Sequence, residues 1–178
     1  MRTTRLDYYT NYKTNYDLIN KSILKSIFEM VKLTKIVLNI GQKDCKKEKI
    51  LSVILALELL TNQQGSFTKS KKNIIELKIK KGAIVGCKVT LRKKNMFLFL
   101  EKLVLFYFPK IKDFKGFQIN QGNFSFSVKN ILNFFELSDE FSQFSQLPKL
   151  DVVLVLKNSN TQITKVLLNS FNFPILKD

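Results

Sequence analysis

Apolar and polar residues alternate at several places along this 178-residue chain. Alternation predicts β-strands, because successive side chains of a strand point to opposite faces. In the stretch GCKVTLR, Cys87, Val89 and Leu91 suit a hydrophobic core, whereas Lys88, Thr90 and Arg92 form a cationic and hydroxylic face. Strands are predicted over 33–40, in part of 65–82, and over 86–92, 124–129 and 150–157, the last as a central strand.

Helices are predicted where apolar residues recur every three or four positions. The predicted helices span 17–30, 46–62, 96–107 and 159–171. Pro109 ends the third, because proline disfavours helical geometry in the residue before it. Side chains that can accept a hydrogen bond precede the other starts, so the candidate N-caps are Asp44, Asn95, and Ser159 or Asn160.

Strands and helices interleave without a regular βαβ rhythm, which predicts an α+β fold. We expect a single domain over residues 1–178 with a mostly antiparallel sheet. Helices are expected to pack on one sheet face and to leave the other for a partner. A basic loop or ribbon is predicted to protrude at about 68–86. The length and the 45% hydrophobic content suffice for a core.

Charge narrows the class of partner. The chain has 30 Lys and Arg against 14 Asp and Glu, a net charge of +16, which favours a polyanion or an anionic membrane surface. Residues 66–116 alone hold 14 basic and 3 acidic residues, a net charge of +11. A solvated surface accounts for many single lysines, but this concentration on alternating strands favours polyanion binding.

Composition argues against catalysis and against a bound cofactor or metal. The chain has no His, which removes the commonest general base and metal ligand. Cys45 and Cys87 are predicted to be reduced thiols, since two distant cysteines do not make a zinc site. Glu136, Asp139 and Glu140 lack a partner base and are interpreted as a solvated loop or helix turn. No dinucleotide, Walker or nucleophile-elbow motif occurs.

Two stretches, 50–60 and 96–108, are strongly apolar but shorter than the roughly 20 residues of a membrane-spanning helix. No membrane span is therefore expected. No signal peptide is visible, and the N-terminal MRTTRLDYYTNYK is a poor transit peptide because it combines Asp7 with three tyrosines. The abundance of Lys, Asn, Ile and Phe fits A- and T-rich codons, and so an organelle genome.

Binding to nucleic acid remains the best-supported chemistry. Lysine clusters at 68–72, 78–81, 92–94 and 110–115 suit phosphates, and such contacts weaken steeply with salt. Bases or 2′-hydroxyls then supply the discrimination. Candidates for that second role are Asn39, Thr68, Ser70, Thr90 and Asn95. Phe67, Phe114 and Phe117 suit either stacking on bases or a place in the core.

Several motifs occur in an order that resembles one protein family. They are LDYY (6–9), KIVLNIG (35–41), TKSKKNI (68–74), KIKKGAIVGCKVTLR (78–92), PKIKDFKGF (109–117), GNFSFSVK (122–129), LDVVLVL (150–156) and NFP (172–174). In this order they resemble universal large-subunit ribosomal protein five, which binds 5S ribosomal RNA in the central protuberance. The resemblance covers nearly the whole chain, and GCKVTLR and PKIKDFKG are its most specific pieces.

The resemblance implies a structural, non-enzymatic component of the large ribosomal subunit with an RNA-facing sheet. It implies rRNA contacts by Lys35, Asn39, Thr68, Lys69, Lys71, Lys88, Thr90, Arg92 and Lys94. The segment KKNIIELKIKKGAIVG resembles the loop that reaches the elbow of peptidyl-site tRNA, with Lys72, Lys78, Lys80 and Lys81 as candidates. The region with Lys110, Lys112 and Lys115 resembles the part that contacts a small-subunit protein across an intersubunit bridge. Neighbouring central-protuberance proteins are further expected partners.

The chain also departs from the family pattern. Only Gly41 remains of a glycine-rich turn, Lys93 stands where a glycine is expected, and the loop after residue 117 is short. Such erosion and the lysine-rich composition suggest an organelle-encoded copy in the mitochondrial matrix, with a plastid as the alternative. A free-standing organellar RNA-binding module and a peripheral protein on anionic membrane remain alternatives. An RNA-modifying enzyme would need a placed acid, base or cofactor loop, and none is visible.

Overall fold

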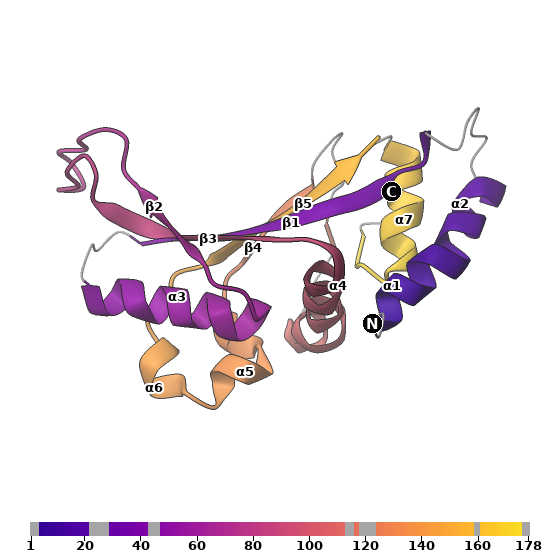
Figure 1. Cartoon of the computed structure of the whole chain (residues 1–178). Coiled ribbons are helices and arrows are strands. Elements are labelled where there is room, and N and C mark those ends of the chain that lie inside the picture. The colour runs from indigo at the N-terminus through magenta and orange to yellow at the C-terminus, as the bar shows by residue number, and fades with distance from the viewer. Residues whose placement is uncertain are drawn as a thin grey trace. The chain divides into compact units, whose positions relative to one another are not determined.

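The computed structural model describes residues 4–21, 29–42, 47–112, 116–117, 124–158 and 161–175 (Figure 1). The chain divides into two compact units. The terminal unit comprises Met1–Ile36, Arg92–Phe126 and Val153–Asp178, and the inner unit comprises Val37–Leu91 and Ser127–Val152. The single domain expected over 1–178 stays a prediction.

A five-stranded antiparallel sheet confirms the predicted α+β class. Its strands run in the order β2 (Ser66–Lys69), β3 (Ile84–Leu91), β1 (Lys32–Gly41), β5 (Leu150–Lys157) and β4 (Phe124–Val128). All five strands were predicted, to within two residues where the prediction gave bounds. β5 has a neighbour on each side, as expected of an interior strand, although β1 occupies the centre.

In the inner unit, α3 (Lys47–Thr61) packs against β3 and confirms the helix predicted over 46–62. Its apolar residues lie on one side, because Ile50, Val53, Leu57 and Leu60 recur at helical spacing and are all buried. The short helices α5 (Phe135–Ser138) and α6 (Phe141–Phe144) contact α3 and bury one apolar side chain each. A 3₁₀ turn, η5 (Ile131–Asn133), precedes them.

The terminal unit begins with α1 (Arg5–Tyr9), which continues through a π-helical turn, η1 (Thr10–Thr14), into α2 (Asn15–Lys21). α4 (Lys93–Lys102) likewise continues through a π-helical turn, η3 (Leu103–Tyr107), into a 3₁₀ turn, η4 (Phe108–Lys110). α1 contacts α4, and α2 contacts α7 (Thr161–Ser170), the helix predicted over 159–171.

Five phenylalanines form an aromatic cluster in the terminal unit. Neighbouring ring centroids lie 4.8 to 6.2 Å apart, the range in which edge-to-face and tilted pairs are favourable. Phe117 is a member, since its centroid is 4.8 Å from that of Phe126 and 5.3 Å from that of Phe124. The cluster consists of Phe108, Phe117, Phe124, Phe126 and Phe173.

Two helix starts differ from the prediction. The first helical segment begins at Arg5 rather than at residue 17, and residues 22–28 of the predicted 17–30 helix lie outside the described part. Asn95 is not an N-cap, because α4 already begins at Lys93 and Arg92 occupies the cap position. Four residues predicted as caps or as a free thiol lie outside the described ranges, namely Asp44, Cys45, Ser159 and Asn160.

The two apolar stretches considered as membrane segments lie in helices of this fold. Residues 50–60 belong to α3, and 96–108 run through α4, η3 and the start of η4. Among the residues described, no helix reaches the length and apolar character needed to span a bilayer.

Candidate nucleic-acid interface

β3 has one buried and one open face, as its sequence predicts. Cys87 and Leu91 are fully buried and Val89 is 2% exposed, whereas Lys88 is exposed and Thr90 is half-buried. The buried residues face α3, which packs on this strand. The side chains between them therefore point away from α3 on the opposite side of the sheet.

β2 adds polar groups to the same face. It pairs with β3 so that Ser66 lies opposite Lys88 and Thr68 opposite Gly86, and directly opposite residues share a face. The Ser66 hydroxyl also donates a hydrogen bond to the Lys88 carbonyl oxygen at 3.1 Å. The ladder shifts register between Thr68 and Lys69, and this irregularity starts the protruding segment that follows.

β1 is the other neighbour of β3, and Leu38 and Ile40 are fully buried on it. Asn39 lies between them, is half-buried and so faces the side that carries Lys88. We call the set Asn39, Ser66, Thr68, Lys88 and Thr90 the polar sheet face. It offers one cation and four short hydrogen-bonding side chains, a combination that suits a phosphate-and-ribose surface.

Gly86 explains how closely β1 and β3 approach. A Cβ at this position would collide with the carbonyl oxygen of Ile40 and lie 3.1 Å from the Cα of Gly41. Only glycine fits here, because the contact is with backbone that cannot turn aside. The polar sheet face is therefore low at this point, which lets a bulky ligand approach the backbone.

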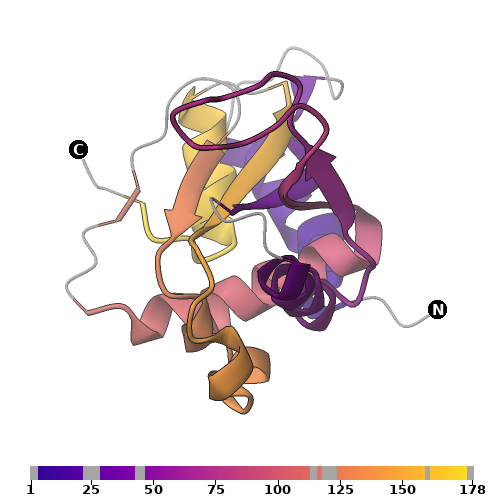
Figure 2. The same cartoon turned by 90° about the vertical axis from the view of Figure 1, so that its left-hand side faces the viewer.

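The segment between β2 and β3 forms an extended, hydrogen-bonded ribbon, residues 70–83, as predicted (Figures 1 and 2). Its base is closed by the Ser70 amide on the Ala83 carbonyl and the Gly82 amide on the Ser70 carbonyl, both at 2.9 Å. The Asn73 side-chain oxygen accepts from the Lys81 amide at 2.6 Å. All four lysines predicted to meet tRNA are located on the ribbon: Lys72, Lys78, Lys80 and Lys81.

Negative charge is scarce around these lysines. Between Glu58 and Glu101 the sequence contains ten basic residues and one acidic residue, Glu76. Lys69 and Lys71 are exposed at the junction of β2 and the ribbon. With so few carboxylates in this stretch, the positive potential is left to an external anion.

Three predicted rRNA contacts belong to the terminal unit. Lys35 is half-buried on β1, and Arg92 and Lys94 are exposed at the start of α4. The first turn of α4 contains no acidic residue, although the positive end of a helix dipole favours anions. Cations at this position are unfavourable without a partner, so the local electrostatics favour a bound anion.

Of the predicted bridge lysines, Lys110 is exposed at the end of η4, Lys112 is exposed after it, and Lys115 lies outside the described residues. Of the aromatic candidates, Phe117 belongs to the aromatic cluster and is not a free stacking residue. Phe67 is 44% exposed at the sheet edge, and Phe114 lies outside the described residues.

Nothing in the described residues resembles a catalytic centre. They contain no group of three or more His, Cys, Asp or Glu able to hold a metal ion. Cys87 is a free thiol, and burial raises its pKa, which suits a core residue and not a nucleophile. Glu136 lies in α5, and Asp139 and Glu140 follow it in an exposed turn, as predicted.

The sequence prediction missed the apolar character of the ribbon end, where Ile75 and Leu77 are exposed. A signal was present, because IIEL interrupts a lysine-rich segment that was already expected to protrude. Apolar residues in a protruding segment have no core to fill, so their presence there indicates an external contact.

Comparison with known proteins gives a consistent picture. Residues 84–175 match the model of the C-terminus of the ribosomal uL5 family. The large ribosomal subunit protein uL5m of Reclinomonas americana is 37% identical over 90% of this chain and 92% of its own length. The large ribosomal subunit protein uL5 of Wigglesworthia glossinidia brevipalpis is 34% identical (95% and 98%), and that of Nitrosomonas europaea is 33% identical (95% and 96%).

Proposed function

The chain belongs to the uL5 family of large-subunit ribosomal proteins, which are structural and not enzymes, and we propose that it binds 5S ribosomal RNA through its polar sheet face. Family membership carries the coarser statement, a structural role with rRNA in the large ribosomal subunit. The nature of the RNA and the contacting residues are the proposal.

The observation that carries this proposal is the two-sidedness of β3. Cys87, Val89 and Leu91 are sealed under α3, while Lys88 and Thr90 lie on the face opposite that helix. The strand cannot slip to bring its cations inward, since a one-residue shift would expose every core residue. The polar face is therefore permanently presented.

The chemistry of this face divides between affinity and recognition. Lys88, Lys69 and Lys71 are placed to neutralise phosphates and to release their counterions. Asn39, Thr68 and Thr90 carry short donors and acceptors that reach ribose 2′-hydroxyls or base edges in a shallow groove. Arg92 and Lys94 would add phosphate contacts at the start of α4.

Two finer contacts belong to the same proposal. The ribbon lysines Lys72, Lys78, Lys80 and Lys81 would meet peptidyl-site tRNA, and Lys110, Lys112 and Lys115 would meet a small-subunit protein across the bridge. The scarcity of carboxylates supports both, since the sequence places only Glu76 among the first set and only Asp113 among the second. Neighbouring proteins of the central protuberance would complete the surroundings.

We also propose a mitochondrial ribosome as the location. Two observations support it: the similarity to a mitochondrial uL5m and the A- and T-rich codon bias that the composition implies. Bacterial relatives are nearly as similar, so the location is a proposal and the ribosome itself is the firmer statement.

The test replaces Lys88 and Arg92 together with alanine and measures binding of a bacterial 5S rRNA transcript between 50 and 300 mM salt, conditions in which phosphate contacts dominate the salt dependence. If both contact phosphate, the slope of log affinity against log salt becomes shallower by roughly 1.5 to 2. The matched control, Lys129→Ala with Lys157→Ala, removes the same charge from exposed positions in other segments. Equal slopes for both double variants would reject the polar sheet face as the contact.

A second measurement separates the ribosomal role from the alternatives. The protein in an organelle lysate is expected to sediment with large subunits in magnesium and to leave them when magnesium is removed. Flotation with anionic liposomes in place of sedimentation would support the membrane alternative. Sedimentation with small RNA–protein particles would support a free-standing RNA-binding module.

A further inference from the structure

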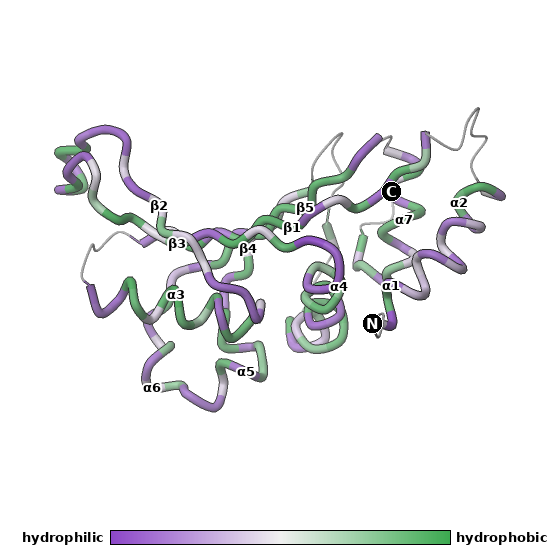
Figure 3. Tube along the Cα trace, viewed as in Figure 1, coloured by the Kyte–Doolittle hydropathy of each residue, from purple (hydrophilic) through white to green (hydrophobic). Residues whose placement is uncertain are grey.

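The end of the ribbon exposes apolar side chains that nothing in the fold requires. We call the segment Ile74–Ile79 the ribbon tip. Ile75 is 90% exposed, Leu77 is 49% exposed and Ile74 is 39% exposed, while Ile79 is buried. Figure 3 shows this green tip between purple, hydrophilic flanks of the ribbon. Exposed apolar side chains grouped in this way mark an interaction surface more often than a lone one does.

Hydrogen bonds hold the tip in one shape. The Ile74 amide donates to the Ile79 carbonyl at 2.9 Å, and the Ile79 amide donates to the Ile74 carbonyl at 3.0 Å. Between them the Lys78 amide donates to the Ile75 carbonyl at 3.0 Å, and Lys78 takes a positive φ of 54°. A closed turn of this kind loses little conformational entropy when it binds, so its exposed side chains are preorganised for a partner.

The charges around the tip identify the class of partner. Lys71, Lys72, Lys78, Lys80 and Lys81 flank or interrupt it, against the single carboxylate of Glu76. Two copies of so basic a segment repel each other, and a partner with a hydrophobic but uncharged surface would leave five cations without counterions. Charge complementarity therefore favours a polyanion that also offers an apolar surface.

RNA offers apolar surface only on the faces of its bases. In a helix these faces are covered by stacking, and they open where a stack ends or where a loop base is splayed out. Resting on the proposed function, we propose that Ile75 and Leu77 contact an open base face of a folded RNA while the ribbon lysines bind the phosphates beside it. The ribbon then recognises a feature of RNA shape and not only negative charge.

This division of roles has a measurable signature. Phosphate contacts weaken as salt rises, whereas contact between an apolar side chain and a base face is almost independent of salt. Ile75→Ser with Leu77→Ser should therefore lower the affinity for a tRNA transcript by roughly ten-fold at every salt concentration, with an unchanged slope. Lys78→Ala with Lys80→Ala should instead make the slope shallower by roughly 1.5 to 2.

The control is Leu51→Ser with Leu55→Ser, which removes two similarly exposed leucines, 56% and 46% exposed, from α3. This variant should bind the tRNA transcript as the unmodified protein does. The tip proposal is overturned if the tip variant also keeps full affinity, or if its loss of affinity changes with salt. It is equally overturned if the tip variant binds RNA normally and fails only in contact with a protein of the small subunit.

A direct probe of stacking is available because the chain contains no tryptophan. Tryptophan placed by Ile75→Trp should show fluorescence quenched on addition of the tRNA transcript, and tryptophan placed by Leu55→Trp should not. An unquenched signal at residue 75, with binding confirmed independently, would refute base-face contact. The tip variants should still bind 5S rRNA, whereas Lys88→Ala with Arg92→Ala should still bind through the tip, so failure of one proposal is distinguishable from failure of the other.

Discussion

Single residues on β3 have three different roles within a few positions. Cys87 and Val89 fill the core under α3, Lys88 and Thr90 form the open face, and Gly86 lets the neighbouring strand approach. The sequence alternation accounts for the first two roles completely. It could not predict the third, because a close approach of two backbones depends on a partner strand more than forty residues away.

Gly86→Ala should destabilise the protein by about 3 kcal/mol, because the new Cβ collides with the Ile40 carbonyl and the strand pair must open. The measurement is urea unfolding followed by circular dichroism. Gly41→Ala is the matched control on the adjoining strand, since a Cβ there has no atom within 4 Å. Equal stability of the two variants would show that β1 and β3 can separate without cost.

Among the elements, those with strong periodicity were predictable and those with broken periodicity were not. α3 and the strands follow a constant period of hydrophobicity, so their bounds fall close to the predicted ones. The N-terminal helix was predicted to start twelve residues late. Its π-helical turn, Thr10–Thr14, inserts an extra residue and shifts the apolar spacing, and Thr and Asn are weak helix formers there.

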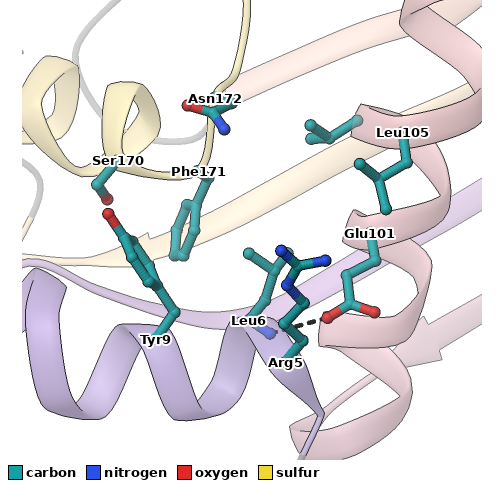
Figure 4. A pocket seen from close by; sticks show the side chains of 9 residues that line it. Arg5, Leu6, Tyr9, Glu101, Leu105, Ser170, Phe171 and Asn172 are labelled. Carbon is teal, nitrogen blue, oxygen red and sulfur yellow. Dashed lines mark hydrogen bonds between the residues drawn. The ribbon is translucent and has the colours of Figure 1, made fainter.

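Interactions between elements were also beyond the sequence. The first turn of α1 is completed by Glu101 of α4, whose Oε1 accepts a hydrogen bond from the Leu6 amide at 2.8 Å (Figure 4). The contact lies beside a pocket of about 230 Å³ lined also by Arg5, Tyr9 and Phe171. Ninety-five residues separate donor and acceptor, so no local signal announces the pair.

Glu101→Ala should cost about 1 kcal/mol of stability, because it leaves a helix-start amide without its acceptor and removes a carboxylate from the positive end of α1. Glu101→Gln keeps an acceptor oxygen and should lose less than half as much. Urea unfolding measures both, and hydrogen exchange of the Leu6 amide reports the local effect. If Glu101→Gln were as costly as Glu101→Ala, charge and not the hydrogen bond would be responsible.

The candidate site was predictable in part for related reasons. Alternation on β3 indicated which side chains are open, and the composition of 66–116 indicated their charge. The sequence could not separate exposed from buried residues where periodicity stops. Phe117, a possible stacking residue, packs in the aromatic cluster, while Ile75, which looks like a core residue, is 90% exposed.

For the whole molecule, charge is the property that matters most and it is unusually simple. The net charge of +16 arises from lysine and arginine, with most of the surplus in residues 66–116, and the chain contains no histidine. Lysine and arginine as residue types stay protonated far above neutral pH, and carboxylates as a type are ionised far below it. Between these limits no side chain type in this protein with an ordinary pKa near 7 is present to change the potential.

RNA affinity should therefore vary less than about two-fold between pH 6 and pH 8 at constant salt, because the charge that binds phosphate does not change in this interval. Cys87 does not alter this expectation, since burial raises its pKa and keeps the thiol neutral there. The measurement is binding of a bacterial 5S rRNA transcript at half-unit steps of pH and fixed ionic strength. A steep loss of affinity across pH 7 would mean that a titrating group, on the RNA or at the chain terminus, controls the interface, and the lysine-based account of binding would then be insufficient.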